Sequence, residues 1–426
     1  MSAVSQPGSL KCTLMWFSVS LVVRVAITFL FVTPGSAQAP PPPPPSYRFS
    51  SDGSSSCIPV EVVADGLVFV QAKVNDHPGW FILDNATQGF TVDRDYAKRI
   101  SVQISGKAPA RGGGSDAIDA GIVRNVQISL KGLALTHRNL VAISLKSLEP
   151  AVGHTVDGII GSRLFDDFVV VVDYENRCVS IYRPDEYRPS GKERIYTVRV
   201  DQHGFQFIDA TIALPGVQPI SGSFLIDGGA NTYADIYKPF SVAHQIPPPA
   251  MKLLDEPGIS TGGETQSRDG RADWINIGSY SIKGPPITFA QDVEGLMAAQ
   301  DYAGLIGTAF LERFVVVFDS PGKRILLTPN RSYEHKAEYD ESGLRIRADG
   351  PAFHRFVVTR IVPESPAKEA GIEPGDIIAS IDNHPAQEVT LTEMRSMFRQ
   401  PDAHYTIGII RGDRQLRVAI RLGPLI

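Results

Sequence analysis

Two aspartates stand out because each one ends a short apolar run and is followed by small or turn-forming residues. Asp84 follows residues 79–83, and Asp227 follows residues 222–226. An apolar run of this length is typical of a buried strand, so each Asp would lie where such a strand ends. If the two carboxyl groups lie a few ångströms apart, they cannot both ionise and must share one proton. Such a pair could supply a general acid and a general base to one reaction.

The segments around the two aspartates belong to a repeated unit. Each is preceded by a stretch of alternating polar and apolar residues, and each is followed by a similar tail. The first tail reads Asp-Gly-Ile-Ile-Gly at 157–161 and Phe-Val-Val-Val-Val-Asp at 168–173. The second reads Ala-Gly-Leu-Ile-Gly at 303–307 and Phe-Val-Val-Val-Phe-Asp at 314–319. Self-similarity at a long offset indicates a duplication, which here delivers one carboxylate per copy.

The elements that would position these residues are those of a mainly β protein. From Cys57 onward, short β-type runs alternate with Gly, Pro, Asn and Asp, which predicts two all-β lobes at 57–187 and 188–332. Each lobe also contains a Gly-rich polar stretch, at 111–115 in the first and at 260–264 in the second. In a two-lobed protein with a cleft, a flap that covers the cleft would lie in such a stretch. We expect one of the two stretches to be a flap.

The N-terminal region differs from the rest of the chain. Lys11 precedes an apolar run at 13–32, and small residues follow it. This order is typical of a secretory signal peptide, here residues 1–37, although Arg24 inside a long apolar run leaves an uncleaved membrane anchor as an alternative. Residues 38–56 are rich in Pro and then in Ser and Gly, which predicts an extended linker. In both cases we expect the body of the protein to lie outside the cytoplasm.

Composition narrows the function classes further. The net charge of −5 over 426 residues is mild and no long basic run is present, so nothing indicates nucleic acid. The nine His residues are scattered without ligand-like spacing, so we expect no metal. Chemistry by the pair Asp84 and Asp227 would require no cofactor either. Cys57 and Cys178 both lie in the first copy and could form a disulfide in an oxidising compartment. Spacing alone leaves open whether they come within bridging distance.

The C-terminal segment, residues 338–426, resembles a PDZ domain of the bacterial periplasmic-protease type. The motifs that carry the resemblance are Ser-Pro-Ala at 365–367, Ala-Gly at 370–371 and Pro-Gly-Asp-Ile-Ile at 374–378. The resemblance implies that an extended peptide adds to an edge strand beside a helix, with backbone amides receiving its C-terminal carboxylate. Alternatively, the groove docks on the lobes or stays empty. The residues that the resemblance assigns to the groove are Gly343, Leu344, Arg345, Ile346, Leu391 and Met394.

The two lobes resemble the retropepsin-like aspartic proteases, and the whole layout resembles a bacterial family of duplicated aspartyl proteases with a C-terminal PDZ domain. The first copy carries Phe-Ile-Leu-Asp at 81–84 and Gly-Ile-Ile-Gly at 158–161. The second copy carries Phe-Leu-Ile-Asp at 224–227 and Gly-Leu-Ile-Gly at 304–307. The resemblance therefore rests on two copies of the same pair of motifs and extends over nearly the whole chain after the linker.

This resemblance implies an exported, periplasmic aspartic endopeptidase in which Asp84 and Asp227 activate water for peptide-bond hydrolysis, with a polypeptide as substrate. Both lobes belong to one chain, so a monomer suffices to complete the pair. If the N-terminal segment is not cleaved, the protein would be anchored in the inner membrane. The residues implied to form the active-site loops and their supporting strands are Asn85, Ala86, Gly228, Gly229, Ile160, Gly161, Ile306 and Gly307.

The aspartate loops depart from the family pattern, which is Asp-Thr-Gly-Ala in each lobe. The first loop reads Asp-Asn-Ala-Thr at 84–87 and the second reads Asp-Gly-Gly-Ala at 227–230. In the family, the Thr hydroxyls bond across the lobes; Asn85 can still make polar contacts there, whereas Gly228 has no side chain. Ala86 adds a methyl group that can crowd the water. An inactive protease-like protein that binds peptides through its PDZ domain is therefore the alternative, and a structural envelope component is a third.

Overall fold

The computed structural model describes residues 46–51, 53–114, 116–292 and 298–426, and the strands of these residues form four sheets. The predicted signal segment at 1–37 and the first part of the predicted linker lie outside the described residues. Among the described helices, none is both long enough and apolar enough to span a bilayer.

Lobe 1 is a twisted sheet of short strands with three short helices. Strands β2, β3 and β4 form a meander, and β7 and β8 form a long hairpin whose second strand runs parallel to β5. The bounds in lobe 1 are β1 (Ser46–Phe49), β2 (Ser54–Val63), β3 (Leu67–Val74), β4 (His77–Leu83), β5 (Phe90–Asp93), α1 (Arg94–Arg99), β6 (Ile104–Ala108), β7 (Ala120–Leu130), β8 (Leu133–Ile143), α2 (Glu149–Val152), β9 (Gly158–Ile160) and α3 (Ser162–Asp167).

Lobe 2 repeats this plan. Its large sheet runs in the order β17-β20-β23-β16-β24-β15-β14-β21-β22, and β18 and β19 form a separate hairpin. The bounds in lobe 2 are β12 (Arg194–Thr197), β13 (Arg199–Val200), β14 (Gln206–Ala213), β15 (Ile220–Ile226), β16 (Ala234–Ile236), α4 (Lys238–His244), β17 (Leu254–Asp255), β18 (Gly258–Ser260), β19 (Gly263–Thr265), β20 (Ser267–Arg271), β21 (Trp274–Ile277), β22 (Tyr280–Lys283), β23 (Pro286–Ala290), β24 (Gly304–Ile306) and α5 (Thr308–Leu311).

The strands around Asp84 in lobe 1 and around Asp227 in lobe 2 pair in the same pattern. In lobe 1, β9 pairs parallel with β4 and antiparallel with β5. In lobe 2, β24 pairs parallel with β15 and antiparallel with β16. The next neighbours also agree, because β5 pairs parallel with β8 and β16 pairs parallel with β23. The duplication seen in the sequence is therefore a duplication of topology.

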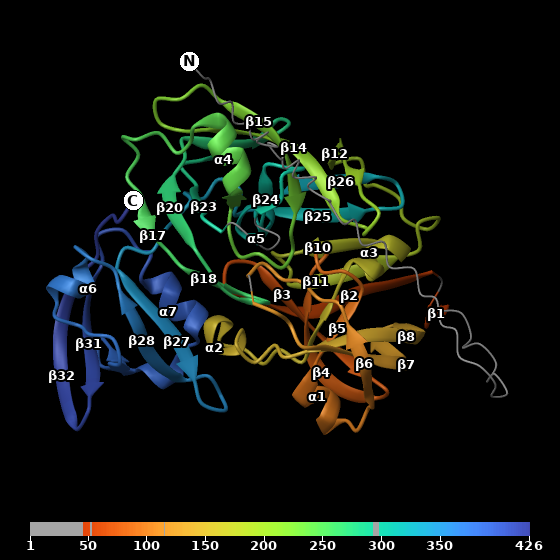
Figure 1. Ribbon diagram of the computed structural model, residues 1–426, viewed down its shortest axis with the longest axis horizontal. Coiled ribbons are helices and arrows are strands. Elements are labelled where there is room, and N and C mark those ends of the chain that lie inside the picture. The colour runs from red at the N-terminus through yellow and green to blue at the C-terminus, as the bar shows by residue number, and fades with distance from the viewer. Residues whose placement is uncertain (1–45, 52, 115, 293–297) are drawn as a thin grey trace, which may run out of the picture. The chain divides into compact units, whose positions relative to one another are not determined.

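A shared sheet joins the lobes, and the repeated tails build it. The bounds are β10 (Val169–Asp173), β11 (Cys178–Tyr182), β25 (Phe314–Asp319) and β26 (Arg324–Pro329). Strands β10 and β25 pair antiparallel at the centre of Figure 1, and Val171 lies opposite Val317, its own counterpart in the second tail. One continuous apolar core runs through both lobes, with Phe168 and Phe314 fully buried in it. This core holds the two copies in a fixed relation.

The C-terminal domain is a separate α+β unit with its own core, formed around Phe356, Met394 and Ile407. Its sheet runs in the order β27-β28-β29-β31-β32, so β27 is an edge strand. The bounds are β27 (Leu344–Asp349), β28 (Arg355–Ile361), α6 (Pro366–Glu369), β29 (Ile377–Ile381), β30 (His384–Pro385), the 3-10 helix η2 (Ala386–Glu388), α7 (Leu391–Met397), β31 (His404–Arg411) and β32 (Arg414–Arg421).

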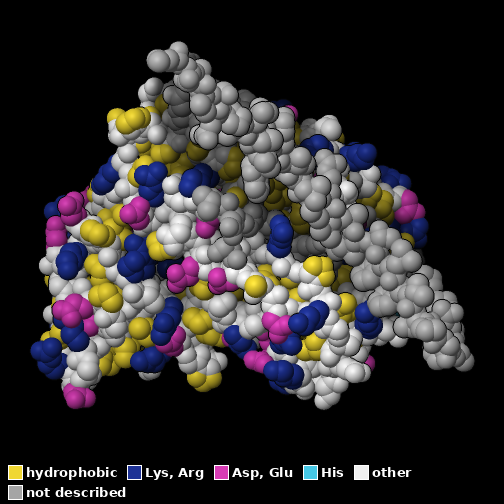
Figure 2. Space-filling view, in the orientation of Figure 1, with side chains coloured by type: hydrophobic (Ala, Val, Ile, Leu, Met, Phe, Trp, Pro, Cys, Tyr) yellow, Lys and Arg dark blue, Asp and Glu magenta, His cyan; other side chains and the backbone are white. Residues whose placement is uncertain are grey.

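The predicted fold class, mainly β with two related lobes followed by an α+β domain, is confirmed. The predicted linker, however, ends before residue 56. Its residues 46–49 form β1, which pairs with β8, because the rings of Tyr47 and Phe49 pack edge-on against Phe168. Basic and acidic side chains are interspersed over the face seen in Figure 2, in keeping with the mild net charge.

Candidate active site

Asp84 and Asp227 occupy equivalent places, each directly after a strand that is paired in parallel with the Gly-containing strand of its tail. The backbone N–H of Asp84 donates to the carbonyl oxygen of Ile160 at 3.0 Å, and the N–H of Asp227 donates to that of Ile306 at 2.9 Å. The glycines that follow, Gly161 and Gly307, are needed because a Cβ at either one would overlap a backbone oxygen of the adjacent loop. The predicted supporting strands thus hold both aspartate loops.

Asn85 links the two aspartate loops across the lobe interface. Its side-chain Nδ2 donates to the carbonyl oxygen of Ile226 at 2.7 Å, and its Oδ1 accepts from the N–H of Gly228 at 2.8 Å. Asn85 is only 1% exposed, so both bonds are shielded from water. A Cβ at Gly228 would lie 3.1 Å from that Oδ1, which is closer than most such contacts. The Asn85 amide therefore both donates to and accepts from the second aspartate loop. It fits there because Gly228 has no side chain.

The next residue in each aspartate loop, Gly229 in lobe 2 and Ala86 in lobe 1, also lies at the contact between the lobes. A Cβ at Gly229 would overlap the carboxylate of Asp84, so the second loop can approach the first aspartate only because residue 229 is glycine. The counterpart Ala86 does carry a methyl group. Ala86 packs against an apolar cluster of lobe 2 that includes Leu225 and Leu305. The extra methyl group thus contributes to contact between the lobes.

The two carboxylates have different hydrogen-bond environments. Asp84 accepts from the N–H groups of Ala86 and Thr87 at 2.8 and 3.1 Å, and from the Thr87 hydroxyl at 2.6 Å. Asp227 accepts from the N–H of Gly229 at 2.8 Å, and Ala230, in the place of Thr87, has no hydroxyl to donate. Donors stabilise a charged carboxylate, so Asp84 is better suited to carry the negative charge.

Burial raises the pKa values of both Asp84 and Asp227, and the charge of Asp84 also acts on Asp227. Burial raises the pKa of Asp227 well above its ordinary value, and the negative charge of Asp84 raises it further. Burial also raises the pKa of Asp84, against the hydrogen bonds from Thr87 and Ala86, which lower it. The pair therefore holds one proton over part of the pH range, and Asp227 is the better site for that proton.

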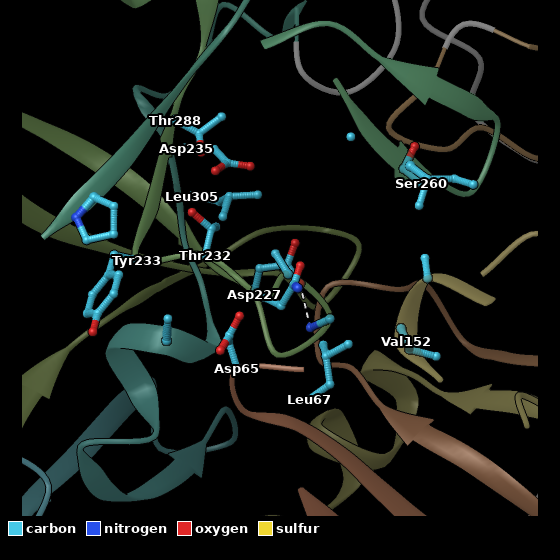
Figure 3. A pocket seen from close by; sticks show the side chains of 18 of the residues that line it. Asp65, Leu67, Val152, Asp227, Thr232, Tyr233, Asp235, Ser260, Thr288 and Leu305 are labelled. Atoms are coloured by element: carbon cyan, nitrogen blue, oxygen red, sulfur yellow. Dashed lines mark hydrogen bonds between the residues drawn. The ribbon is translucent and has the colours of Figure 1, made fainter. Parts of the chain in front are cut away.

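Both carboxylates line a single cleft of about 1360 Å³. Its walls come from both lobes and from the C-terminal domain, and Figure 3 shows Asp227 between Thr232 and Leu67 at the junction of the lobes. The cleft has space for an extended polypeptide segment, which is larger than the small ligands that typical pockets hold.

The Gly-rich stretch of lobe 2 forms a hairpin at the cleft, the arrangement expected of a flap, and we call it the flap hairpin. Residues Gly258–Ser260 and Gly263–Thr265 form the β18–β19 hairpin, and its residues Ser260 and Thr261 line the cleft. In lobe 1, the corresponding Gly-rich stretch forms no strand among its described residues. The two stretches nevertheless meet, because Gly114 and Asp116 donate from their N–H groups to the carbonyl oxygens of Thr261 and Gly262 at 3.3 and 2.9 Å.

The predicted PDZ carboxylate loop is satisfied by a carboxylate of the same chain. Asp340 accepts from the N–H groups of Ser342 and Gly343 at 3.3 and 2.8 Å, and from the Ser342 hydroxyl at 2.6 Å. Arg345 pairs with this carboxylate at 2.8 Å. The amides that the resemblance assigns to a ligand thus already have an acceptor, Asp340, which the sequence analysis did not single out.

The predicted groove is also covered in this structure. Gly153, which ends α2 of lobe 1, lies against α7, since a Cβ there would be 2.9 Å from the Cβ of Leu391 (Figure 1). Arg395 of α7 donates across the groove to the carbonyl oxygen of Ile346 on β27 at 3.1 Å. The structure therefore matches the alternative in which the groove docks on a lobe. The predicted groove residues that are buried are Leu344, Ile346, Leu391 and Met394.

Ion pairs attach the C-terminal domain to both lobes. Arg399 forms a bidentate pair with Asp65, in the β2–β3 turn of lobe 1. Arg345 forms a bidentate pair with Glu256 of lobe 2, with both distances at 2.6 Å. Arg360 also reaches Glu256 at 3.0 Å. Since Glu256 comes directly before the flap hairpin, the edge strand of the C-terminal domain is connected to the base of the flap.

The remaining predicted site features concern cysteines and metals. Cys57 and Cys178 are both free thiols, the first exposed and the second buried on adjacent strands β2 and β11. Burial and the neighbouring Cys57 thiol raise the pKa of Cys178 to about 12. Within the described part of the chain, no group of three or more His, Cys, Asp or Glu side chains is placed to hold a metal ion.

The comparisons with known proteins find two domain families in this chain. Residues 70–164 match the family model for aspartyl proteases, and residues 357–414 match that for PDZ domains. A crystal structure of the HtrA3 PDZ domain with a phage-derived ligand is 23% identical, covers 20% of this chain and 84% of its own, and has a TM-score of 0.17. The photosystem II D1 C-terminal processing protease is 21% identical, covers 19% and 22%, and has a TM-score of 0.18. No curated protein matches significantly.

Proposed function

We propose that this chain, which combines a retropepsin-like aspartyl protease domain with a C-terminal PDZ domain, is an endopeptidase whose reacting carboxyl groups are Asp84 and Asp227. The observation that carries the proposal is Asn85, whose amide joins the two aspartate loops although neither family Thr is present. A catalytic pair needs this fixed spacing, because misplacement by about 1 Å can cost about 100-fold in rate.

The unequal hydrogen bonding assigns a role to each carboxyl group. The charged Asp84 takes a proton from a water molecule as its oxygen attacks the carbonyl carbon, and the protonated Asp227 donates to the carbonyl oxygen. Asp84 then passes its proton to the leaving nitrogen, the C–N bond breaks, and Asp227 recovers a proton from the hydroxyl of the tetrahedral intermediate. Protons and bonds balance within the pair, so the step needs no further reactant.

The test of this function is cleavage of casein, an unfolded substrate, by wild type and by Asp84→Ala and Asp227→Ala. Each replacement is expected to lower the rate by at least about 10²- to 10⁴-fold, the usual contribution of a general acid or base. Asp209→Ala, which removes an exposed carboxylate from β14 of lobe 2, is the control that should retain activity. Wild type without activity at any pH would instead support the inactive peptide-binding alternative.

The pH dependence should follow the raised pKa values of the pair. Activity needs Asp84 charged and Asp227 protonated, so it is expected to fall as pH drops through the pKa of Asp84 and as pH rises through that of Asp227. Both values lie above 3.8, the ordinary pKa of Asp, so the maximum of kcat/KM is expected above that pH. A profile with its maximum below pH 3.8 would contradict this prediction.

We further propose that the protein acts outside the cytoplasm, in the periplasm. The support is the order of charged, apolar and small residues at 1–37, either as a cleaved signal peptide or as an anchor in the inner membrane. PDZ domains are peptide-binding modules, and although α2 covers the predicted groove here, the edge strand β27 borders the same cleft as Asp84 and Asp227. A polypeptide could therefore contact both domains at once.

A further inference from the structure

One row of side chains crosses the lobe 2 sheet beside Asp227. Asp235 on β16 lies opposite Leu305 on β24 and opposite Thr288 on β23. Thr288 lies opposite Asp269 on β20, and Leu305 lies opposite Leu225 on β15. Directly paired residues point to the same face of a sheet, and all five of these line the cleft. The floor of the cleft in lobe 2 is therefore partly acidic.

The equivalent row in lobe 1 contains no charge. Ile82 on β4 pairs with Ile159 on β9, and Ile159 pairs with Thr91 on β5. Thr91 pairs with Val141, and Val141 pairs with Ile122. Position for position, Thr91 corresponds to Asp235, and Ile122 corresponds to Asp269. The duplicated sheets have thus diverged in the row next to the catalytic pair, which is uncharged in lobe 1 and carries two carboxylates in lobe 2.

The Asp235 carboxylate is incompletely satisfied by the protein. Its side chain is 8% exposed, and its buried Oδ1 has no hydrogen-bond partner among the described residues. Figure 3 shows Asp235 beside Thr288 on the wall of the pocket, in line with Leu305, Thr232 and Asp227. The Thr232 and Thr288 hydroxyls act against burial by lowering the pKa of Asp235, but neither of them carries a positive charge. A buried carboxylate without a cationic partner is costly, so a substrate cation is a suitable partner for it.

The charged surroundings of Asp235 are acidic. Asp227 and Asp269 lie on the same face, and none of the described ion pairs involves any of the three. Asp269 accepts from the Thr288 hydroxyl at 2.9 Å and from the Tyr339 hydroxyl at 3.0 Å, so its oxygens have donors. Burial raises the pKa of Asp235 to about 6 and that of Asp269 to about 7. A cation placed here would relieve this strain.

We propose that Asp235 forms a subsite for a Lys or Arg side chain of the substrate, next to Asp227 on the lobe 2 side of the cleft. The inference rests on the proposed function and adds a specificity to it. The aliphatic stem of the basic side chain would lie along Leu305 and Leu225, while its charged end pairs with the Asp235 carboxylate, which lines the cleft. The lobe 1 side, floored by Ile82 and Ile159, would accept an apolar side chain.

The first test is the set of bonds that wild type cleaves in unfolded casein, identified by mass spectrometry. We expect Lys or Arg to be enriched at one fixed position within about three residues of the cleaved bond, since the row lies beside the catalytic pair and residues in a strand advance about 3.3 Å each. Cleavage without enrichment of a basic residue at any position would overturn the subsite and leave the proposed function standing.

The second test uses two peptides built on a cleaved casein sequence, identical except for Lys or norleucine at the enriched position. Wild type should favour the Lys peptide about 10- to 100-fold in kcat/KM, the range expected for a hydrogen bond to a charged group. Asp235→Asn and Asp235→Thr should bring this ratio close to one. The second variant copies the residue of lobe 1, so it suits the same place in the sheet. Asp209→Asn, on the exposed face of β14, should keep the ratio.

The two proposals fail in different ways. A ratio that is unchanged in Asp235→Asn and in Asp235→Thr would overturn the subsite even if cleavage is fast. If wild type cleaves nothing, the proposed function fails, and two fluorescently labelled peptides of one casein sequence, identical except for Lys or norleucine at the central position, are then compared by fluorescence polarisation. Tighter binding of the Lys peptide that is lost in both Asp235 variants would still support the subsite, whereas equal binding would overturn it.

Discussion

Asn85→Ala is expected to lower the free energy of unfolding by about 2 to 5 kcal/mol and to reduce kcat/KM at least about 100-fold. The replacement leaves the carbonyl of Ile226 and the N–H of Gly228 without their partner in a site that is 1% exposed at Asn85. Each buried group left unsatisfied costs about 1–3 kcal/mol. Activity falls as well, because the same bonds hold the loops of Asp84 and Asp227 in register. Urea unfolding followed by Trp fluorescence measures the first effect, and casein cleavage measures the second.

Three variants make this prediction specific. Asn85→Thr supplies a hydroxyl that can donate and accept, so it should recover part of the stability. Gly228→Thr alone should destabilise, because its Cβ would lie 3.1 Å from the Asn85 Oδ1. Asn231→Ala, an exposed Asn in the same lobe 2 loop, should change little. A loss below about 0.5 kcal/mol for Asn85→Ala, the usual scale of a surface substitution, would show that the amide does not hold the lobes together.

Arg345→Ala should lower stability by about 3 to 5 kcal/mol, the cost of breaking a largely buried ion pair by removing one partner. Arg345 is bonded to Glu256 through two nitrogens and to Asp340 through a third contact, and all three side chains are about one-fifth exposed. Its loss leaves two carboxylates close together, with Arg360 as the remaining described partner of Glu256. Casein cleavage should fall too, since Glu256 stands at the base of the flap.

The neighbouring Arg347 provides the matched control. It lies on the same strand, β27, and its pair with Asp349 at 2.9 Å is half exposed on the Arg side. An exposed ion pair contributes about 0–1 kcal/mol, so Arg347→Ala should have a small effect. Arg345→Lys keeps the charge but not the bidentate geometry and should fall between the two. Equal losses for Arg345→Ala and Arg347→Ala in urea unfolding would contradict the role of this pair.

Much of the fold was predictable because its signals are local. The apolar runs before Asp84 and Asp227 form β4 and β15, and the valine-rich tails form β10 and β25. Strand formation of this kind depends on neighbours along the chain, and the duplication repeats each signal. The end of the predicted linker was wrong, because residues 46–49 form a strand through pairing with the distant β8 and through contact of Tyr47 and Phe49 with Phe168.

The candidate site also has features that local sequence predicts and features that depend on contacts between the lobes. The types and places of the two aspartates follow from the sequence alone, since each depends on one strand and one turn. The substitutions in the loops could be read in sequence only as losses, because an amide that bonds to both Ile226 and Gly228 is visible only once the lobes pack together. The flap could not be assigned to one lobe for a similar reason, since both stretches are rich in Gly.

What the sequence determined by itself is therefore the repeated unit, its mainly β class, the pair of aspartates and the kind of C-terminal domain. The tertiary structure decided how these parts act on each other. It brought Asp235 into one row with Thr288 and Asp269 through the register of three strands. It placed Gly153 against Leu391 and so closed the predicted groove. Local patterns depend on residues close together in the chain, whereas registers and docked surfaces depend on residues far apart, which only the packed core brings together.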